Sequence, residues 1–170
     1  MPPLFHVSET PGITLFTPRP SPSFFEAITG DVVFAIEERL LHHYLLPRDC
    51  PRVCFYANAD SAKADVARFL GDAPFGMVIE RDWLSRIEST PLFVYEFPAT
   101  PFRVLDAGAG YYVAYEAVQP LKMETIHHAK AALLARGVAL HVEDRLHAWA
   151  AAVKNSSLQY SLIRMRNAQP

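Results

Sequence analysis

Proline is the residue that most restricts how this chain can fold, because so much of it lies near one end. The 170 residues include 14 prolines and only 7 glycines. Six of the prolines precede residue 25, namely Pro2, Pro3, Pro11, Pro18, Pro20 and Pro22. Proline fixes φ and lacks the N–H that helices and inner strands require. We therefore expect an extended N-terminal loop with at most one short strand, Leu4–Ser8.

The composition is that of a globular protein. Hydrophobic residues make up 51% and charged residues 20%, with a formal net charge of −2. This is enough apolar material for one domain spanning residues 1–170 and excludes a strongly basic nucleic-acid coat. No apolar run reaches the roughly 18–20 residues of a membrane span. The first residues, Met-Pro-Pro-Leu-Phe-His, lack the features of a secretory signal, and two cysteines exclude a disulfide framework. We expect a cytoplasmic protein without a membrane partner.

Short apolar runs and helical spacing alternate irregularly along the chain. The runs predict strands at Val32–Ile36, Arg52–Ala57, Met77–Glu80, Leu92–Phe97, Tyr111–Val118 and Val138–Val142. The helical spacing predicts helices at Glu37–Leu46, Ser61–Leu70, Arg81–Ile87, Met123–Arg136 and Arg145–Lys154. Without a steady alternation of strand and helix, the pattern favours an α+β fold with a mostly antiparallel sheet and flanking helices.

Common metal and nucleotide motifs are missing from the sequence. Cys50 and Cys54 form a single C-x3-C, which is half of a zinc site at best. His42-His43 and His127-His128 are adjacent pairs, whose side chains diverge on a helix. There is no phosphate-binding glycine loop and no G-x-S-x-G motif. We expect no metal.

Arginines are concentrated in two places that could bind an anion. In Pro47-Arg-Asp-Cys-Pro-Arg52, two prolines fix a turn from which Arg48 and Arg52 project, and guanidinium groups suit phosphate or carboxylate. Alternatively, Asp49 pairs with one arginine and the turn is structural. The segment Ser161–Asn167 alternates apolar and basic residues like a half-buried strand, and its basic face is either an anion site or simply solvated.

Two groups of side chains could line a binding pocket. Strand alternation places His6 and Ser8 on one face, where the histidine either contacts a ligand or is a hydrogen-bonded structural group. Tyr111, Tyr112 and Tyr115 either line a stacking pocket or pack within a sheet.

Nearly the whole chain resembles a bacterial family of functionally uncharacterised proteins. The similarity rests on LFHVSE from Leu4, PRDCPRV from Pro47 and SLIRMRNA from Ser161. This resemblance implies no activity.

Three shorter pieces are similar to the ADP-ribosyltransferase fold of the poly(ADP-ribose) polymerase branch. They are Phe5-His-Val-Ser8, Val33-Phe-Ala35 and Tyr111-Tyr-Val-Ala-Tyr115 followed by Gln119. The resemblance implies that His6 and Ser8 contact the ribose and amide of NAD. It also places the catalytic glutamate of that fold at Tyr111 and its ring-stacking tyrosine at Val33. Tyrosine is neutral near pH 7 and cannot supply the glutamate's negative charge, so transferase activity is expected to be altered or lost.

The sequence thus supports three interpretations of function. The first is a cleft that binds a nucleotide or another phosphate-bearing small molecule, with NAD as the candidate cofactor. There His6 and Tyr111 would be the catalytic positions, and Ser8, Arg19, Arg48, Arg52 and Tyr112 would bind the ligand. The second is a structural or interaction protein whose arginines form surface ion pairs. The third is an RNA- or phosphate-ester-processing protein that uses the basic tail, although nucleic acid is not the favoured partner.

Overall fold

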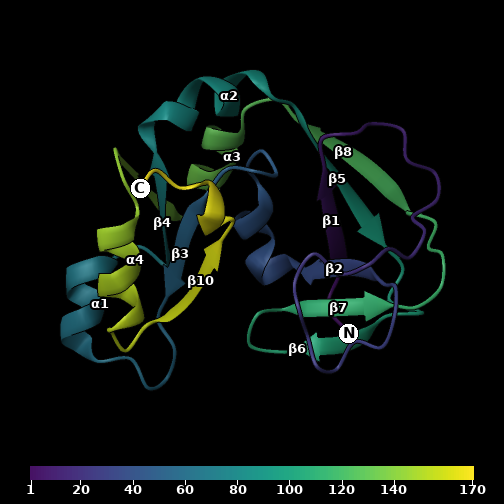
Figure 1. Cartoon of the computed structure of the whole chain (residues 1–170), viewed down its shortest axis with the longest axis horizontal. Helices are drawn as coiled ribbons and strands as arrows, with labels where there is room; N and C mark the ends of the chain where they lie inside the picture. The colour runs from purple at the N-terminus through teal and green to yellow at the C-terminus, as the bar shows by residue number, and fades with distance from the viewer. The chain divides into compact units, whose positions relative to one another are not determined.

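The chain passes repeatedly between two folded units, each of which contains one sheet (Figure 1). The structure is a computed structural model that describes residues 1–170. Unit 1 comprises Met1–Leu45 and Pro91–Ile126, and unit 2 comprises Leu46–Thr90 and His127–Pro170. The elements are those of an α+β protein with mostly antiparallel pairing, which confirms the expected fold class. None of the helices has the length and apolar character needed to cross a bilayer.

Unit 1 contains a six-stranded sheet in which every neighbouring pair is antiparallel. In spatial order its strands are β6 (Arg103–Asp106), β7 (Tyr111–Ala114), β2 (Val33–Glu37), β1 (Leu4–Ser8), β5 (Leu92–Phe97) and β8 (Lys122–Ile126). The expected strand Leu4–Ser8 is therefore confirmed, and it lies inside the sheet. In Figure 1, β6, β7 and β2 run crosswise to β1 and β5. The sheet turns between β1 and β2, where only Leu4↔Glu37 and Phe5↔Ile36 are paired.

One face of this sheet carries the hydrophobic core of unit 1. Alternate residues of β1, β2, β5 and β7 enter it, and the proline-rich loop contributes Phe16. Its buried members are Leu4, Phe16, Val33, Ala35, Tyr95, Phe97, Phe102, Tyr112, Ala114 and Val118. The loop is attached to the sheet by paired backbone hydrogen bonds between Phe16 and Val118 and between Arg19 and Val32. The proline-rich segment forms no second strand, but two isolated bridges hold it against the sheet, where it covers the core face.

Unit 2 contains a four-stranded sheet with helices packed against it. Its strands in spatial order are β10 (Gln159–Ile163), β3 (Arg52–Tyr56), β4 (Phe75–Glu80) and β9 (Val138–Glu143), and only β4 and β9 are parallel. The helices are α1 (Lys63–Phe69), α2 (Leu84–Ser89), α3 (Ala129–Ala135) and α4 (His147–Lys154). Val53, Phe55 and Val78 point from the sheet toward α1 and α4 and pack there with Phe69 and Val153.

Two predicted helices need correction, the first in its extent and the second in its type. Residues Lys122–Ile126 form β8, and α3 begins only at Ala129. The residues Lys-Met-Glu-Thr-Ile fit either period, and pairing with β5 selects the strand. The predicted helix Glu37–Leu46 is a 3-10 helix, η1 (Glu38–Tyr44).

Three strand predictions also need correction. The strand that begins at Tyr111 ends at Ala114, because Val118 pairs with Phe16 of the loop. Strand β10 ends at Ile163, where Arg164 adopts a left-handed φ of 56° and starts the 3-10 helix η3 (Met165–Asn167). Strand β6 lies in a segment where the sequence predicted none.

Gly76 lies in close contact with a neighbouring strand of the unit 2 sheet and provides a test of its packing. It lies opposite Phe55, and a Cβ at residue 76 would be 2.1 Å from the Phe55 ring. We expect Gly76→Ala to lower the free energy of unfolding by about 1–3 kcal/mol, because the ring is surrounded by buried side chains and cannot move aside.

Urea unfolding followed by circular dichroism would measure this change. Gly108→Ala is the matched control, since the nearest atom to its added Cβ is 3.4 Å away. The control should change the free energy of unfolding by no more than about 0.5 kcal/mol. Equal effects of the two substitutions would contradict the packing described for Gly76.

Candidate functional site

The imidazole of His6 is held in one orientation by the neighbouring strand. Its Nδ1 lies 3.1 Å from the carbonyl oxygen of Phe34 on β2. A carbonyl oxygen can only accept, so Nδ1 carries the hydrogen and donates it. Along β1, alternation places His6 on the same face as Leu4 and Ser8, which is the face of the core.

Aromatic rings surround His6 on that face. The Phe16 ring lies edge-on at 5.0 Å between centroids, and the Phe97 ring lies at 6.1 Å. Phe16 also packs against Phe97 at 4.8 Å and Tyr95 at 5.0 Å. His6 therefore has the surroundings of a hydrogen-bonded structural histidine, which is one of the two roles that the sequence allowed.

Tyr95 fixes the loop that passes over this face. Its hydroxyl donates to the Thr10 carbonyl oxygen at 2.7 Å and accepts from the Ile13 N–H at 3.1 Å. At the start of the loop, the Ser8 hydroxyl accepts from the Thr10 N–H at 3.0 Å. These bonds position Phe16 beside His6.

The structure places Tyr112 on the His6 face and Tyr111 on the opposite one. In the register of β2 with its neighbours, Tyr111 and Phe5 both pair with Ile36 and so share a face. Tyr112 pairs with Ala35 and lies in the core. The Tyr111 hydroxyl is hydrogen-bonded to that of Tyr44 on η1. The two predicted catalytic positions, His6 and Tyr111, are thus in one sheet, separated by β2, but their side chains leave it in opposite directions.

The predicted anion-binding arginines differ in exposure. Arg19 is exposed in unit 1, and its backbone bonds to Val32 hold it at the edge of the loop. Arg48 is also exposed, on the Pro47–Arg52 turn in unit 2. Arg52, by contrast, is only 1% exposed.

Arg52 organises the Pro47–Arg52 turn from inside. Its Nε donates to the Cys50 carbonyl oxygen at 2.9 Å. Its Nη2 donates to the carbonyl oxygens of Pro47 at 2.9 Å and Arg48 at 3.2 Å. The Cys50 N–H also donates to the Pro47 carbonyl oxygen, at 3.0 Å. Because the two prolines of the turn supply no backbone donors, the guanidinium provides most of the remaining hydrogen bonds to its carbonyls.

The C-terminal segment completes this turn. The Asn167 side-chain amide donates to the Asp49 carbonyl oxygen at 2.8 Å, so the carbonyls of residues 47 to 50 all accept from side chains. Two residues later, the Gln169 N–H donates to the buried Glu80 carboxylate at 2.7 Å. Sequence analysis missed Asn167 and Glu80, because no local pattern shows that the tail reaches the turn. The PRDCPRV and SLIRMRNA segments therefore meet within unit 2.

The two cysteines lie close to Arg52 and are buried. Burial raises the pKa of Cys50 to about 11 and that of Cys54 to about 12, although the charge of Arg52 opposes both shifts. Both thiols are therefore protonated near neutral pH and are poor nucleophiles.

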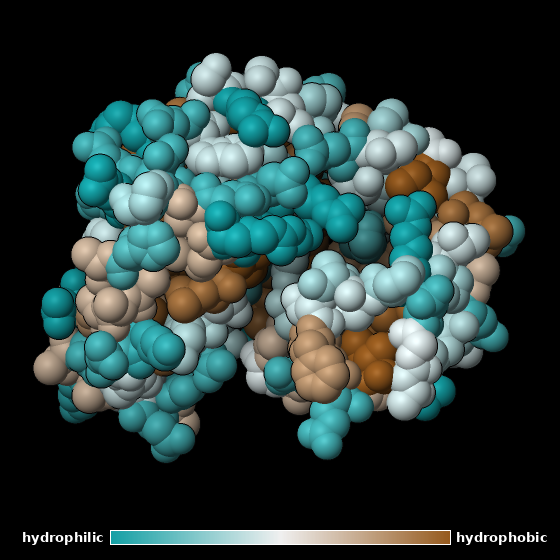
Figure 2. Space-filling model, in the orientation of Figure 1, coloured by the Kyte–Doolittle hydropathy of each residue, from teal (hydrophilic) through white to brown (hydrophobic).

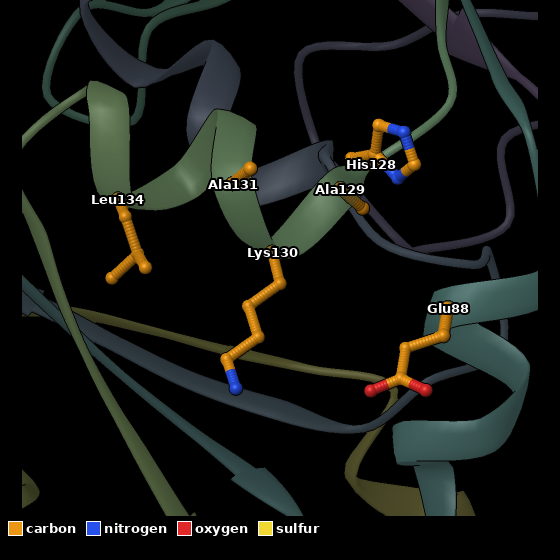
Figure 3. Close-up of a pocket in the computed structure, with 6 residues that line it drawn as sticks. All are labelled: Glu88, His128, Ala129, Lys130, Ala131 and Leu134. Carbon is orange, nitrogen blue, oxygen red and sulfur yellow. The ribbon is translucent and has the colours of Figure 1, made fainter.

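Each unit has a shallow hollow on its surface. The hollow in unit 2, of about 300 Å³, lies between α2 and α3 (Figure 3). Glu88 and Lys130 extend from these facing helices at its edge without forming an ion pair with each other. The hollow in unit 1, of about 360 Å³, lies beside Tyr95, Ile13 and Met123. No group of three or more His, Cys, Asp or Glu side chains is arranged to hold a metal ion.

Removing the buried guanidinium tests whether Arg52 organises the turn. We expect Arg52→Ala to lower the free energy of unfolding by about 3–5 kcal/mol, because several buried carbonyls lose charged donors at once. Arg48→Ala is the matched variant on the same turn and should cost at most about 1 kcal/mol, since its side chain is exposed. Urea unfolding measures both, and the opposite ranking would show that Arg48 is the structural arginine.

The raised thiol pKa values predict low reactivity and alkaline instability. We expect neither cysteine to react with a disulfide reagent at pH 8 in the folded protein and both to react in urea. The thiol pKa values are higher in the folded protein than in an unfolded chain, so the unfolded chain loses these protons first as the pH rises. The stability that the protonated thiols give the fold is therefore present below about pH 9 and is lost as the pH rises toward 11–12. Rapid labelling of a cysteine in the folded protein would contradict this burial.

Comparison with known proteins assigns the chain to a family and gives it no activity. No curated protein and no solved structure is significantly similar to it. A family model described as "Family of unknown function (DUF6886)" matches residues 5–168, from β1 to the end of the docked tail. The chain is therefore a member of this family of unknown function.

Proposed function

We propose that the chain binds a nucleotide or another phosphate-bearing small molecule, and that any ADP-ribosyltransferase chemistry is altered or lost. The observation that carries this proposal is the position of β1 and β7 on either side of β2 in one antiparallel sheet. The resemblance to ADP-ribosyltransferases requires these strands, with His6 and Tyr111, to lie close together. The proposal also places the protein in the cytoplasm.

In unit 1 the proposed contacts are His6, Ser8 and Arg19. His6 and Ser8 share a face and offer an imidazole and a hydroxyl to a ribose or an amide. Arg19 is exposed on the loop and offers its guanidinium to a phosphate. Because Phe16 packs against His6, a ligand that reaches the imidazole must displace this ring and open the Phe16–Val118 bridge.

The absence of an acidic group at residue 111 supports the loss of transferase chemistry. When nicotinamide leaves, positive charge develops on the ribose, and in the ADP-ribosyltransferases that the chain resembles a glutamate carboxylate stabilises this charge. Tyr111 is a phenol on the opposite face from His6 and is bonded to Tyr44. Tyr112, on the His6 face, is buried in the core and is likewise not a carboxylate.

In unit 2 the proposed anion contact is Arg48. The hydrogen bonds of Arg52 and Asn167 fix the backbone on both sides of it, so less entropy is lost when Arg48 grips an anion. Arg52 instead supports the alternative interpretation of a structural turn, since its donors are used by carbonyl oxygens.

Calorimetric titration tests the two proposed contacts separately, with ADP-ribose for unit 1 and inorganic phosphate for unit 2. We expect Arg19→Ala to weaken ADP-ribose binding and Arg48→Ala to weaken phosphate binding, each by about 1–3 kcal/mol, the scale of a hydrogen bond to a charged group. Arg136→Ala removes an exposed arginine that belongs to neither proposed contact, and this variant should bind like wild type. A thermal melt of each variant separates lost binding from lost folding.

Three results would overturn parts of the proposal. Absence of binding to ADP-ribose, ATP and inorganic phosphate would favour a structural or interaction protein. If neither arginine variant changes binding, Arg19 and Arg48 do not contact the ligand. Nicotinamide release from NAD at roughly 1 per second or faster, which is ordinary for an enzyme, would show that transferase activity is retained.

A further inference from the structure

The outer edge of the unit 1 sheet is formed by β8, which pairs with β5 on one side only. An edge strand directs alternate N–H and C=O groups away from its sheet, where another strand can pair with them. Lys122, Met123 and Glu124 are exposed along this edge. The edge is therefore accessible to a strand from another molecule.

Hydrophobic side chains gather beside this edge. Leu121 is 65% exposed and Met123 is 41% exposed, which is high for apolar residues. Met123 pairs with Tyr95 of β5, so its side chain lies on the same face as the 360 Å³ hollow that it helps to line. Figure 2 shows hydrophobic residues, in brown, at the surface in the region of the β1–β2 loop and β8. A strand that added to β8 would cover part of this apolar surface.

The charges on β8 are complementary to those of a second β8 in the antiparallel direction. With a two-fold axis at Met123, Lys122 of each copy lies opposite Glu124 of the other, and the two Met123 residues face each other. With the axis at Glu124, the two glutamates oppose one another, which is unfavourable. Of these two registers, the sequence Lys-Met-Glu favours the one centred on Met123.

Lys122 already takes part in such an ion-pair ladder. Its Nζ lies 2.8 Å from a carboxylate oxygen of Glu96 on β5. The hydrogen bond and charge of Glu96 raise the pKa of Lys122, and the charge of Glu124 adds to this. In the paired edge, each Lys122 would lie between Glu96 of its own sheet and Glu124 of the second copy.

The opposite edge of the sheet is less suited to pairing. β6 has four residues and its pairing with β7 is irregular between Val104 and Asp106. Such irregularities twist an edge strand away from a regular partner. We propose that the chain forms a two-fold dimer by antiparallel pairing of β8 with β8 of a second copy, in the register centred on Met123.

A charge-reversal experiment on the full chain tests this dimer. Sedimentation equilibrium of the wild-type chain between about 5 and 300 µM, the range in which small interfaces associate, should show a monomer–dimer equilibrium. Lys122→Glu leaves two glutamates on the strand and Glu124→Lys leaves two lysines. Each variant alone should dimerise at least about 10-fold more weakly, because like charges then face each other.

An equimolar mixture of the two variants provides the decisive measurement. Each glutamate of one variant then faces a lysine of the other, so heterodimers should form at least about 10-fold more strongly than either variant alone. They should be weaker than the wild-type dimer, because Lys122→Glu also places a glutamate opposite Glu96 of its own sheet. Arg103→Glu on β6 is the matched control and should leave wild-type dimerisation unchanged.

Circular dichroism melts would confirm that all three variants fold. A wild-type chain that is monomeric throughout the range, a mixture that does not associate, or a dimer lost with Arg103→Glu would each overturn the proposal.

Discussion

A buried guanidinium holds together the part of the chain where proline leaves the backbone without donors. The carbonyl oxygens of Pro47, Arg48 and Cys50 face the buried Arg52 side chain, and a buried carbonyl without a partner costs about 1–3 kcal/mol. Arg52 donates to these three groups, and Asn167 donates to a fourth carbonyl of the turn. The start of β3, the shape of the turn and the docking of the tail all depend on these bonds, so this arginine has a structural role that a lysine, with a single ammonium, could not fill in the same geometry.

In unit 1, the sheet face carrying His6 serves as a core and is also the face on which we propose ligand contacts. The Phe16 ring beside His6 belongs to a loop attached to the sheet by single bridges, whereas β1 and β5 pair along five residues. Local opening costs least where few bonds are broken. Apart from its hydrogen bonds to Tyr95, the loop is therefore held to this face by fewer backbone bonds than β1 is.

Much of the fold could be predicted from the sequence, because local patterns determine it. The prolines on both sides limited β1 to Leu4–Ser8, and apolar runs located β2, β3, β5 and β9 to within a few residues. The pattern failed where pairing with a distant strand decided between helix and strand, as in β8. It also failed at the end of β7, where Val118 pairs with Phe16 of the loop and does not continue the strand.

The candidate site was less predictable than the fold. Sequence alone singled out His6, Arg48 and Arg52. It did not show that Arg52 is buried and Arg48 exposed, or that Arg52 pairs with Ile163 of β10, more than 100 residues away. Likewise, the side chains of His6 and Tyr111 point in opposite directions because of how β2 pairs with both β1 and β7. The sequence of one segment alone does not show this register.

The long-range pairing of β1 has a consequence for how the protein is made. Leu4 pairs with Phe97, so β1 lacks one of its two neighbours until about 90 more residues have been synthesised. At roughly 5–20 residues per second, this delay is on the order of 5–20 s. During this delay, the backbone N–H and C=O groups on one side of β1 have no strand partner and can pair with other unfolded chains. The prolines on either side keep this exposed segment short, since neither flank can extend the strand and offer a longer template for aggregation.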